Sequence, residues 1–258
     1  MVITLLSDFG DVYPASMKGV ILSINPAASI VDISHSIPRY DIRAGAFILM
    51  SCARFFPSGT VHIAVVDPGV GTERRQIAVK AESDYFGTHY FTGPDNGLLI
   101  PAARSIGDFE AYIITNEKLF RKNVSGTFHG RDIFAPVGAH ISKGLDIRAS
   151  GEQIFDYIDL EFGQGRKKKG ALEGMIIFID SFGNIVTNIS SDIVEFKYGD
   201  LLEIQGRKVP FLSSYGFSGT GEPLALIGSH GFLEIAVNMG NAAAFFNKTL
   251  GDEILIKI

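Results

Sequence analysis

Short apolar runs alternate with longer amphipathic stretches through the first half of the chain. The runs that predict strands, rich in β-branched and aliphatic residues, are 2–6, 30–33 and 61–66. The stretches that predict helices are 15–24 and 44–56, and Asp41 is placed to cap the second of them. Strands and helices in alternation predict an α/β domain with a mostly parallel sheet and helices on both of its faces.

The pattern changes beyond residues 163–170, where glycine, glutamine and cations replace apolar residues. After this point short strands of period two follow one another, separated by turn residues, with few helical stretches. This predicts a small all-β domain, either a barrel or a sandwich. We therefore expect an α/β domain at residues 1–162, a linker at 163–170 and a β domain at 171–258.

Composition narrows the class of protein. Hydrophobic residues make up 46% of the 258 residues and the net charge is -5, so we expect a globular chain without the basic field that recruits nucleic acid. Cys52 is the only cysteine, which fits a reducing compartment. The first residues lack the features of a signal peptide, and no apolar run reaches membrane-spanning length. A cytoplasmic protein that does not bind nucleic acid or membranes is expected.

Three predicted strands end in an aspartate beside a glycine-containing turn, at Asp8, Asp67 and Asp180. A carboxylate at a strand end can accept hydrogen bonds from two ribose hydroxyls, and ligands of open α/β sheets bind at that edge. Turn formation explains each aspartate equally well. The six histidines are scattered without zinc-site spacing, so no metal site is predicted, although a magnesium ion held by carboxylates stays open.

Several catalytic motifs are missing, including the P-loop, the full dinucleotide fingerprint and the Gly-x-Ser-x-Gly nucleophile elbow. Asp67, one of Arg74 and Arg75, and His129 remain, the histidine in a loop that enters a helix. Together such groups can orient a water molecule, because the arginine keeps the aspartate ionised and either the aspartate or the histidine accepts the proton. The alternative is a surface ion pair and a helix-capping histidine.

Five segments, in this order, resemble the S-adenosyl-L-methionine hydroxide adenosyltransferases, the hydrolase relatives of the fluorinase and chlorinase enzymes. They are residues 65–75, 93–97, 127–132, 180–184 and 233–242. The resemblance runs from Ser7 to about Ala243. It implies that water attacks the 5′ carbon of S-adenosyl-L-methionine, that methionine leaves and that adenosine forms. No metal or redox cofactor is implied, since S-adenosyl-L-methionine is the substrate.

The resemblance assigns catalysis to Asp67, Arg74 and His129, and favours Arg74 over Arg75 by its spacing from Asp67. The halogenating relatives carry other residues at the positions of Asp67 and His129. A carboxylate beside the reacting carbon would repel a halide ion, so the pair indicates water as the nucleophile.

The resemblance also assigns the substrate contacts. Asp8 is expected to bind the ribose hydroxyls and Tyr40 to lie beside the ribose and sulfonium, while Phe128 forms a further wall of the pocket. Those at the methionine end are Asp180, Phe182, Asn184 and Ser229. Those at the adenine are Tyr215, by stacking, and the backbone of Asn241 and Ala242. His230 and Val186 differ from residues found in relatives, which leaves recognition of the methionine end open.

The family fold that the resemblance implies has a seven-stranded sheet in the N-terminal α/β domain and a C-terminal β-barrel. It also implies a homotrimer, in which the N-terminal domain of one subunit and the C-terminal domain of the next hold the ligand. Two other functions are considered: a halide-dependent adenosyltransferase, and a protein that binds S-adenosyl-L-methionine or adenosine without turnover. Asp67 opposes the first, and the complete set of Asp67, Arg74 and His129 opposes the second.

Overall fold

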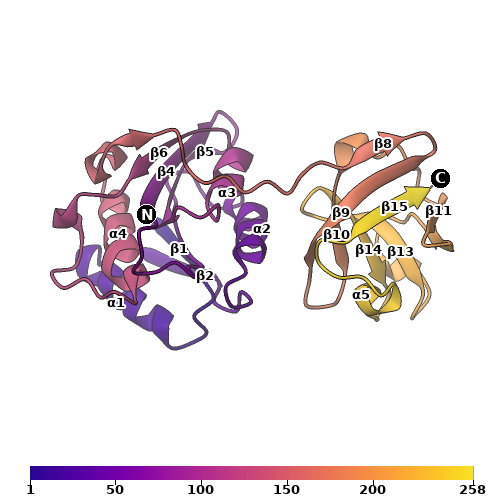
Figure 1. Cartoon of the computed structure of the whole chain (residues 1–258), viewed down its shortest axis with the longest axis horizontal. Helices are drawn as coiled ribbons and strands as arrows, with labels where there is room; N and C mark the ends of the chain where they lie inside the picture. The colour runs from indigo at the N-terminus through magenta and orange to yellow at the C-terminus, as the bar shows by residue number, and fades with distance from the viewer. Residues whose placement is uncertain (258) are drawn as a thin grey trace. The chain divides into compact units, whose positions relative to one another are not determined.

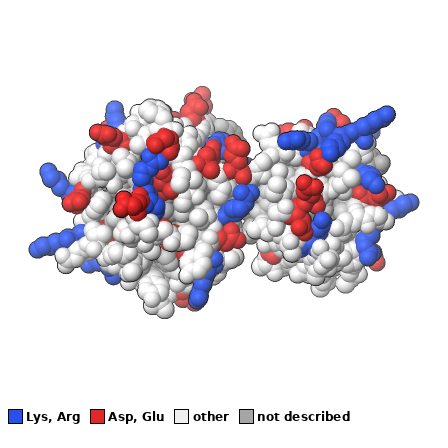
Figure 2. All heavy atoms as spheres, viewed as in Figure 1, with Lys and Arg blue, Asp and Glu red and all other residues white. Residues whose placement is uncertain are grey.

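A computed structural model describes residues 1–257 and divides the chain into two compact units (Figure 1). The first unit is Met1–Leu160 and the second begins at Glu161. The expected two-domain architecture is therefore present. No helix among the described residues is long and apolar enough to cross a membrane. Acidic and basic side chains are interspersed on the visible face of each unit (Figure 2).

The N-terminal unit contains the predicted seven-stranded sheet, with strand order β2-β1-β3-β5-β4-β6-β7. The strands are β1 (Val2–Ser7), β2 (Ser29–Ser34), β3 (Val61–Val65), β4 (Gln76–Ser83), β5 (Gly87–Pro94), β6 (Asp108–Ile113) and β7 (Gln153–Ile154). Every residue of β3 is buried, as expected for a central strand of a covered sheet.

This sheet is mixed, which corrects the expectation of a mostly parallel one. The pairs β1–β2, β1–β3 and β3–β5 are parallel, whereas β4–β5, β4–β6 and β6–β7 are antiparallel. The reason lies in the connection between β4 and β5, which consists only of residues 84–86. A parallel crossover needs a dozen or more residues, so a connection this short forces a hairpin.

Two pairs of helices cover the sheet. The helices are α1 (Tyr13–Ile24), α2 (Ile42–Ala53), α3 (Ile100–Ile106) and α4 (Ala135–Ser142), with a π-helical turn at Gly130–Phe134 and 3₁₀-helices at Glu117–Leu119 and Ile147–Ser150. Helix α1 packs against α4 and α2 packs against α3, and Figure 1 shows the two pairs on opposite sides of the sheet. Asp41 caps α2 as predicted, because its carboxylate accepts the Ala44 N–H at 2.9 Å.

The C-terminal unit is an eight-stranded antiparallel sheet that nearly closes into a barrel. Its strands are β8 (Arg166–Lys168), β9 (Ala171–Ile179), β10 (Ile185–Ser190), β11 (Leu201–Ile204), β12 (Arg207–Pro210), β13 (Pro223–Ile227), β14 (Phe232–Val237) and β15 (Glu253–Lys257). They follow the order β12-β11-β15-β9-β10-β14-β13, with β8 paired to β9. The Leu212 N–H donates to the Ala225 carbonyl at 2.8 Å and draws the two ends of the sheet together. A short helix, α5 (Ala242–Phe245), and 3₁₀-helices at Ser191–Ile193 and Tyr215–Phe217 complete the unit.

The cationic run at 166–169, expected within a linker at 163–170, takes part in this sheet. Its residues Arg166–Lys168 form β8, which pairs antiparallel with β9. Lys168 lies 2.7 Å from Glu173, and Lys167 lies 2.5 Å from Glu195. Ion pairing with acidic neighbours therefore lets a run of like charges form an exposed edge strand.

Two fully buried histidines form a hydrogen-bonded chain through the N-terminal sheet. His62 Nδ1 lies 2.7 Å from the Thr4 hydroxyl, His62 Nε2 lies 3.1 Å from His89 Nδ1, and His89 Nε2 lies 3.2 Å from the Phe86 carbonyl. Burial, followed by the proximity of His89, lowers the pKa of His62 to about 3. Burial also lowers the pKa of His89. Both imidazoles are therefore neutral in the folded protein at neutral pH.

We expect the N-terminal unit to lose stability as the pH falls below about 6.5, the ordinary pKa of histidine. Above this pH the imidazoles are neutral in both the folded and the unfolded chain. Below it the unfolded chain binds protons, whereas the buried rings of His62 and His89 stay unprotonated. The free energy of unfolding should fall by up to about 1.4 kcal/mol per pH unit for each proton, until the pH approaches the folded pKa. Urea unfolding followed by circular dichroism measures this slope, and His62→Asn should reduce it. An equal slope in wild type and variant would contradict the assignment.

Candidate active site

The segments that follow β1 and β3 and the segment that precedes β4 lie at one edge of the N-terminal sheet. Strands β1 and β3 are parallel, so Asp8 and Asp67, which follow them, leave the sheet at the same edge. Strand β4 runs in the opposite direction to β5, which is parallel to β3, so the residues that precede β4 begin at that edge as well. The topology therefore brings Arg74 back to Asp67.

Arg74 connects the two other residues predicted for catalysis. Its Nε donates to both carboxylate oxygens of Asp67, at 2.9 and 3.0 Å, and its Nη2 also contacts Asp67 Oδ2. The same Nη2 lies 3.0 Å from His129 Nδ1. The Asp67 side chain is 3% exposed and that of Arg74 is 11% exposed. The guanidinium also lies over the Phe134 ring, 5.2 Å from its centroid.

This geometry defines the state of His129. A guanidinium can only donate, so His129 Nδ1 accepts and the ring proton of the neutral imidazole is on Nε2. Burial lowers the pKa of His129, and the positive charge of Arg74 lowers it further. His129 is therefore a neutral ring whose Nε2–H is a hydrogen-bond donor.

Arg75 lies in a separate ion-pair network. Its Nε donates to Asp95 at 2.9 Å, and its Nη1 and Nη2 contact the carboxylate and the carbonyl of Asp156 at 2.9 and 2.6 Å. Asp95 in turn accepts the Ile158 N–H at 2.8 Å. The structure thus brings Arg74 to Asp67 and His129, whereas Arg75 connects Asp95 to the segment around residue 156.

The turn that carries Asp67 packs directly against the loop that carries His129. Gly71 adopts φ +77°, and a Cβ atom placed on it would lie 2.1 Å from the carbonyl oxygen of Gly126. Both the backbone conformation and the lack of space require glycine at this position. The contact sets the distance between the two loops, and therefore between Arg74 and His129.

Asp132 anchors the His129 loop, a role that was not predicted from the sequence. Its fully buried carboxylate accepts from Arg121 Nη1 at 3.1 Å, Arg131 Nε at 2.7 Å and the Ser125 N–H at 2.9 Å. Burial acts to raise the pKa of Asp132, but the arginine and backbone donors outweigh it, so the net shift is downward. Its place three residues after His129 and directly after Arg131 was the available signal.

Asp8, Tyr40 and Phe128, the other predicted site residues of the N-terminal unit, make two separate sets of contacts. Asp8 Oδ2 accepts the Tyr40 N–H at 3.0 Å, and Tyr40 adopts φ +66° with its ring largely exposed. Phe128 packs edge-to-face against Phe9 and Tyr13, with ring centroids 5.4 and 5.6 Å apart. Asp8 and Tyr40 are thus joined, while Phe128 forms an aromatic cluster with Phe9 and Tyr13.

In the C-terminal unit, Asp180 organises the turn between β9 and β10. Its Oδ1 accepts the N–H groups of Phe182 and Asn184 at 2.9 and 2.8 Å, and its Oδ2 accepts the Asn184 side-chain amide at 2.9 Å. The Phe182 ring is exposed and Asn184 is buried. Within the chain, Asp180 therefore makes the contacts of a turn-forming aspartate, which was the alternative role considered from the sequence.

The segment at 241–242 lies against this turn. The Gly183 carbonyl accepts the Ala243 N–H at 2.9 Å, and Asn241 caps α5 by accepting the Ala244 N–H at 2.8 Å. Ala242 is fully buried. Of the other predicted contacts in this unit, Tyr215 begins a 3₁₀-helix and Ser229 lies in the turn between β13 and β14. The structure thus joins Asp180, Asn184 and Asn241 into one part of the unit.

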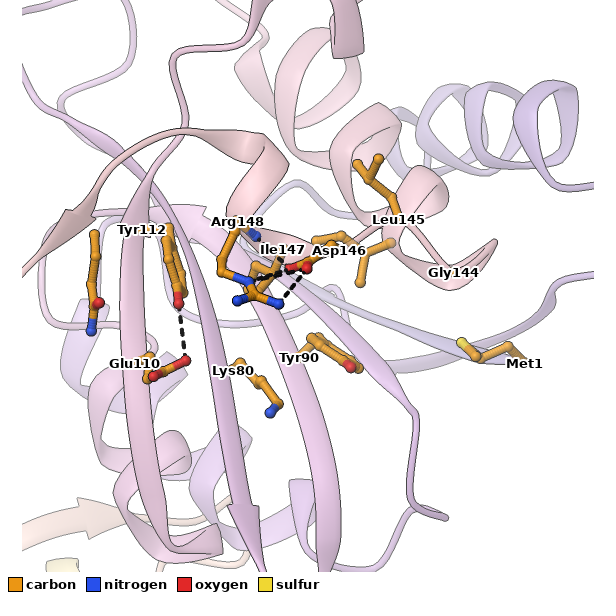
Figure 3. A pocket seen from close by; sticks show the side chains of 12 residues that line it. Met1, Lys80, Tyr90, Glu110, Tyr112, Gly144, Leu145, Asp146, Ile147 and Arg148 are labelled. Atoms are coloured by element: carbon orange, nitrogen blue, oxygen red, sulfur yellow. Dashed lines mark hydrogen bonds and ion pairs between the residues drawn. The ribbon is translucent and has the colours of Figure 1, made fainter.

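A cavity of about 600 Å³ elsewhere on the N-terminal unit contains none of the predicted site residues. Figure 3 shows Tyr112 directed toward Glu110 and Arg148 directed toward Asp146. The Tyr112 hydroxyl donates to Glu110 at 2.9 Å, Arg148 pairs with Asp146 at 2.6 Å, and Lys80 pairs with Glu82 at 2.7 Å. Among residues 1–257, no group of three or more histidine, cysteine or acidic side chains is placed to hold a metal ion.

Comparison with protein families matches both units. Residues 3–151 match the SAM hydroxide adenosyltransferase N-terminal domain, where SAM is S-adenosyl-L-methionine, and residues 174–255 match the C-terminal domain of that family. The chain belongs to the SAM hydroxide adenosyltransferase family. The family resemblance noted in the sequence is thereby confirmed.

Individual relatives cover nearly the whole chain. An (R)-S-adenosyl-L-methionine hydrolase of Methanocaldococcus jannaschii is 40% identical over 99% of this chain and 95% of its own length. A fluorinase of an Actinoplanes species is 30% identical over 97% of this chain and 95% of its own length. The crystal structure of an uncharacterized conserved protein from Thermotoga maritima has a TM-score of 0.90 and 36% identity, and each chain is covered completely. The match over full length shows that both units belong to the family architecture.

We expect the pKa of His129 to rise when the neighbouring cation is removed. In Arg74→Gln the charge that disfavours the imidazolium is gone, while the carboxylates of Asp67 and Asp132 still favour it. Histidine side-chain nitrogen NMR across a pH series measures both the pKa and the tautomer. Arg75→Gln is the control and should leave His129 unchanged, since Arg75 contacts Asp95 and Asp156. An unchanged pKa in Arg74→Gln would contradict the geometry.

Proposed function

We propose that this protein is an enzyme that hydrolyses S-adenosyl-L-methionine to adenosine and L-methionine. The observation that carries the proposal is the buried cluster of Asp67, Arg74 and His129 at the edge of the sheet, in a chain of this family. Relatives named as (R)-S-adenosyl-L-methionine hydrolases are 32–40% identical to this chain, which supports water as the nucleophile.

The reaction requires the protein's side chains to take part in only one proton transfer. The water oxygen bonds to the 5′ carbon, the carbon–sulfur bond breaks and its electron pair goes to sulfur, which leaves as the neutral thioether of methionine. A sulfonium is already a good leaving group, so no acid has to protonate it. The site must align water, carbon and sulfur and accept one proton from the water. This reaction requires no metal or redox cofactor.

We propose that Asp67 accepts the proton of the attacking water and that His129 donates a hydrogen bond to that water. His129 Nδ1 is occupied by Arg74 and its Nε2 already carries a proton, so the neutral ring can orient the water but not deprotonate it. The Asp67 carboxylate has acceptor positions beyond those that Arg74 uses. Arg74 thus holds both groups, and Asp67 accepts the proton.

Residues of both units contribute to the proposed binding of the substrate. As the family resemblance suggests, Asp8 and Tyr40 bind the ribose and Phe128 forms a further wall of the pocket. We assign the methionine end to Asp180, Phe182, Asn184 and Ser229, and the adenine to Tyr215, Asn241 and Ala242. A homotrimer, in which neighbouring copies supply the two groups of residues, and a cytoplasmic location complete the proposal. Neither nucleic acid nor a membrane is a proposed partner.

The direct test is to incubate the purified protein with S-adenosyl-L-methionine, with and without chloride, and to separate the products by chromatography. We expect adenosine and methionine in equal amounts, independent of chloride. Asp67→Asn and His129→Gln should reduce kcat by about a hundredfold or more, the range found when a positioned acid–base group is removed. Asp156→Asn is the control, because Asp156 pairs with Arg75 outside the cluster.

Other products would lead to other conclusions. A halogenated adenosine that requires chloride would make the protein a halide-dependent adenosyltransferase. Retention of substrate without any product would make it a binding protein. Full activity in Asp67→Asn would remove Asp67 from the mechanism.

We expect Gly71→Ala to reduce adenosine formation by about a hundredfold. The new Cβ would displace the Gly126 carbonyl, and a shift of about 1 Å between catalytic loops has an effect of this size. Gly144→Ala is a matched control, since Gly144 also has a positive φ, +95°, but has nothing within 4 Å of the added Cβ. Gly71→Ala should lose more stability than Gly144→Ala, because only its added Cβ meets a neighbouring backbone atom, and thermal unfolding identifies a temperature at which both variants are folded for the assay. Equal activity in the two variants would show that the contact between the loops is unimportant.

A further inference from the structure

Glu234 is a buried carboxylate in the C-terminal unit that the proposed mechanism does not use. It lies in β14, opposite Val186 of β10 on one side and Leu226 of β13 on the other. Only 4% of the residue is exposed. A carboxylate in this position has lost its water and must be stabilised by donors from the protein.

Two neutral donors stabilise the Glu234 carboxylate. The Tyr215 hydroxyl donates to Oε1 at 2.7 Å, and His230 Nε2 lies 3.2 Å from Oε2. The Phe232 N–H donates to His230 Nδ1 at 3.2 Å, so in the neutral ring the proton lies on Nε2 and is donated to Glu234. A single carboxylate therefore fixes the orientation of both a phenol and an imidazole.

The two donors come from different segments of the chain. Tyr215 begins the 3₁₀-helix after β12, and His230 lies with Ser229 in the turn of residues 228–231 between β13 and β14. The turn is tightly packed, because a Cβ atom on Gly228 would lie 2.4 Å from the His230 ring and 2.8 Å from Glu234 Oε2. Glu234 thus connects the segment of Tyr215 to the turn of Ser229.

The neighbourhood of Tyr215 links this cluster to the turn of Asp180. Burial raises the pKa of the Tyr215 phenol, and the hydrogen bond to Glu234 and the negative charges of Glu234 and Asp180 raise it further. The charge of Asp180 therefore acts on the same hydroxyl that Glu234 binds. We have proposed above that Tyr215, Ser229 and Asp180 all bind the substrate.

We propose that Glu234 is a positioning residue for substrate binding, which holds Tyr215 and the turn of Ser229 and His230 in the orientation that receives S-adenosyl-L-methionine. This inference rests on the proposed function and adds a residue to that site. Its carboxylate accepts two hydrogen bonds at once. A glutamine of the same shape has one acceptor oxygen and an amide that donates, so it can satisfy only one of the two partners.

The experiment measures kcat, KM and nucleoside affinity in Glu234→Gln, Tyr215→Phe and the double variant. We expect KM to rise about tenfold in each single variant, with kcat within about twofold of wild type, because the catalytic cluster lies in the other unit. Calorimetric titration with the thioether analogue S-adenosylhomocysteine, which has no sulfonium, should show the same loss of affinity. Since both changes break one hydrogen bond, the double variant should be no weaker than Glu234→Gln alone.

Glu253→Gln is the control, since Glu253 is an exposed glutamate of the same unit, and it should match wild type. A KM and an analogue affinity unchanged in Glu234→Gln would overturn the inference, as would a loss in kcat alone or losses that multiply in the double variant. Tyr215→Phe keeps the test decisive if Glu234→Gln does not fold. Absence of adenosine from the wild type would refute the proposed function instead, and the analogue titration would still decide the role of Glu234.

Discussion

The charged groups of a buried ion pair need hydrogen-bond partners from the protein in place of water. The pair of Asp67 and Arg74 imposes this requirement on the N-terminal unit. The guanidinium donates to Asp67, to the Arg75 carbonyl and to His129, and its flat face lies over Phe134. Loss of one partner would leave a buried charge without compensation, which costs far more than the pair itself contributes. The loops that carry Asp67 and His129 must therefore meet, and the close contact of Gly71 with Gly126 fits this need.

The sequence predicted the part of this arrangement that depends on local pattern. A buried strand that stops before Pro68 identified Asp67. Two adjacent arginines follow this turn, so the pattern alone left Arg74 and Arg75 as alternatives. Spacing favoured Arg74, and only the fold shows that Arg75 turns toward Asp95 and Asp156. The mixed sheet was missed because strand direction depends on the length of a connection, and only the structure shows that residues 84–86 alone join β4 to β5.

Glu234 illustrates a different limit of sequence reasoning. Alternation along residues 233–237 predicts a strand with one solvated face, on which a glutamate needs no explanation. In the barrel both neighbours of β14 are present, and Leu233 to Val237 are all buried. Its partners Tyr215 and His230 come from loops whose positions are set by tertiary closure. No periodicity encodes such contacts, whereas the cap of Asp41, which acts three residues away, was predicted correctly.

The charges of the two clusters suit the cationic substrate that we propose. An arginine near a sulfonium would repel it, but Asp67 compensates Arg74, and the low pKa of His129 prevents a second positive charge. The neutral state of His129 is thus as important as its position, because an imidazolium would oppose binding of the sulfonium. In the C-terminal unit Glu234, which contacts Tyr215 and His230, adds an acidic group beside residues that we assign to substrate binding. Arg74 therefore organises the site at no electrostatic cost to the substrate.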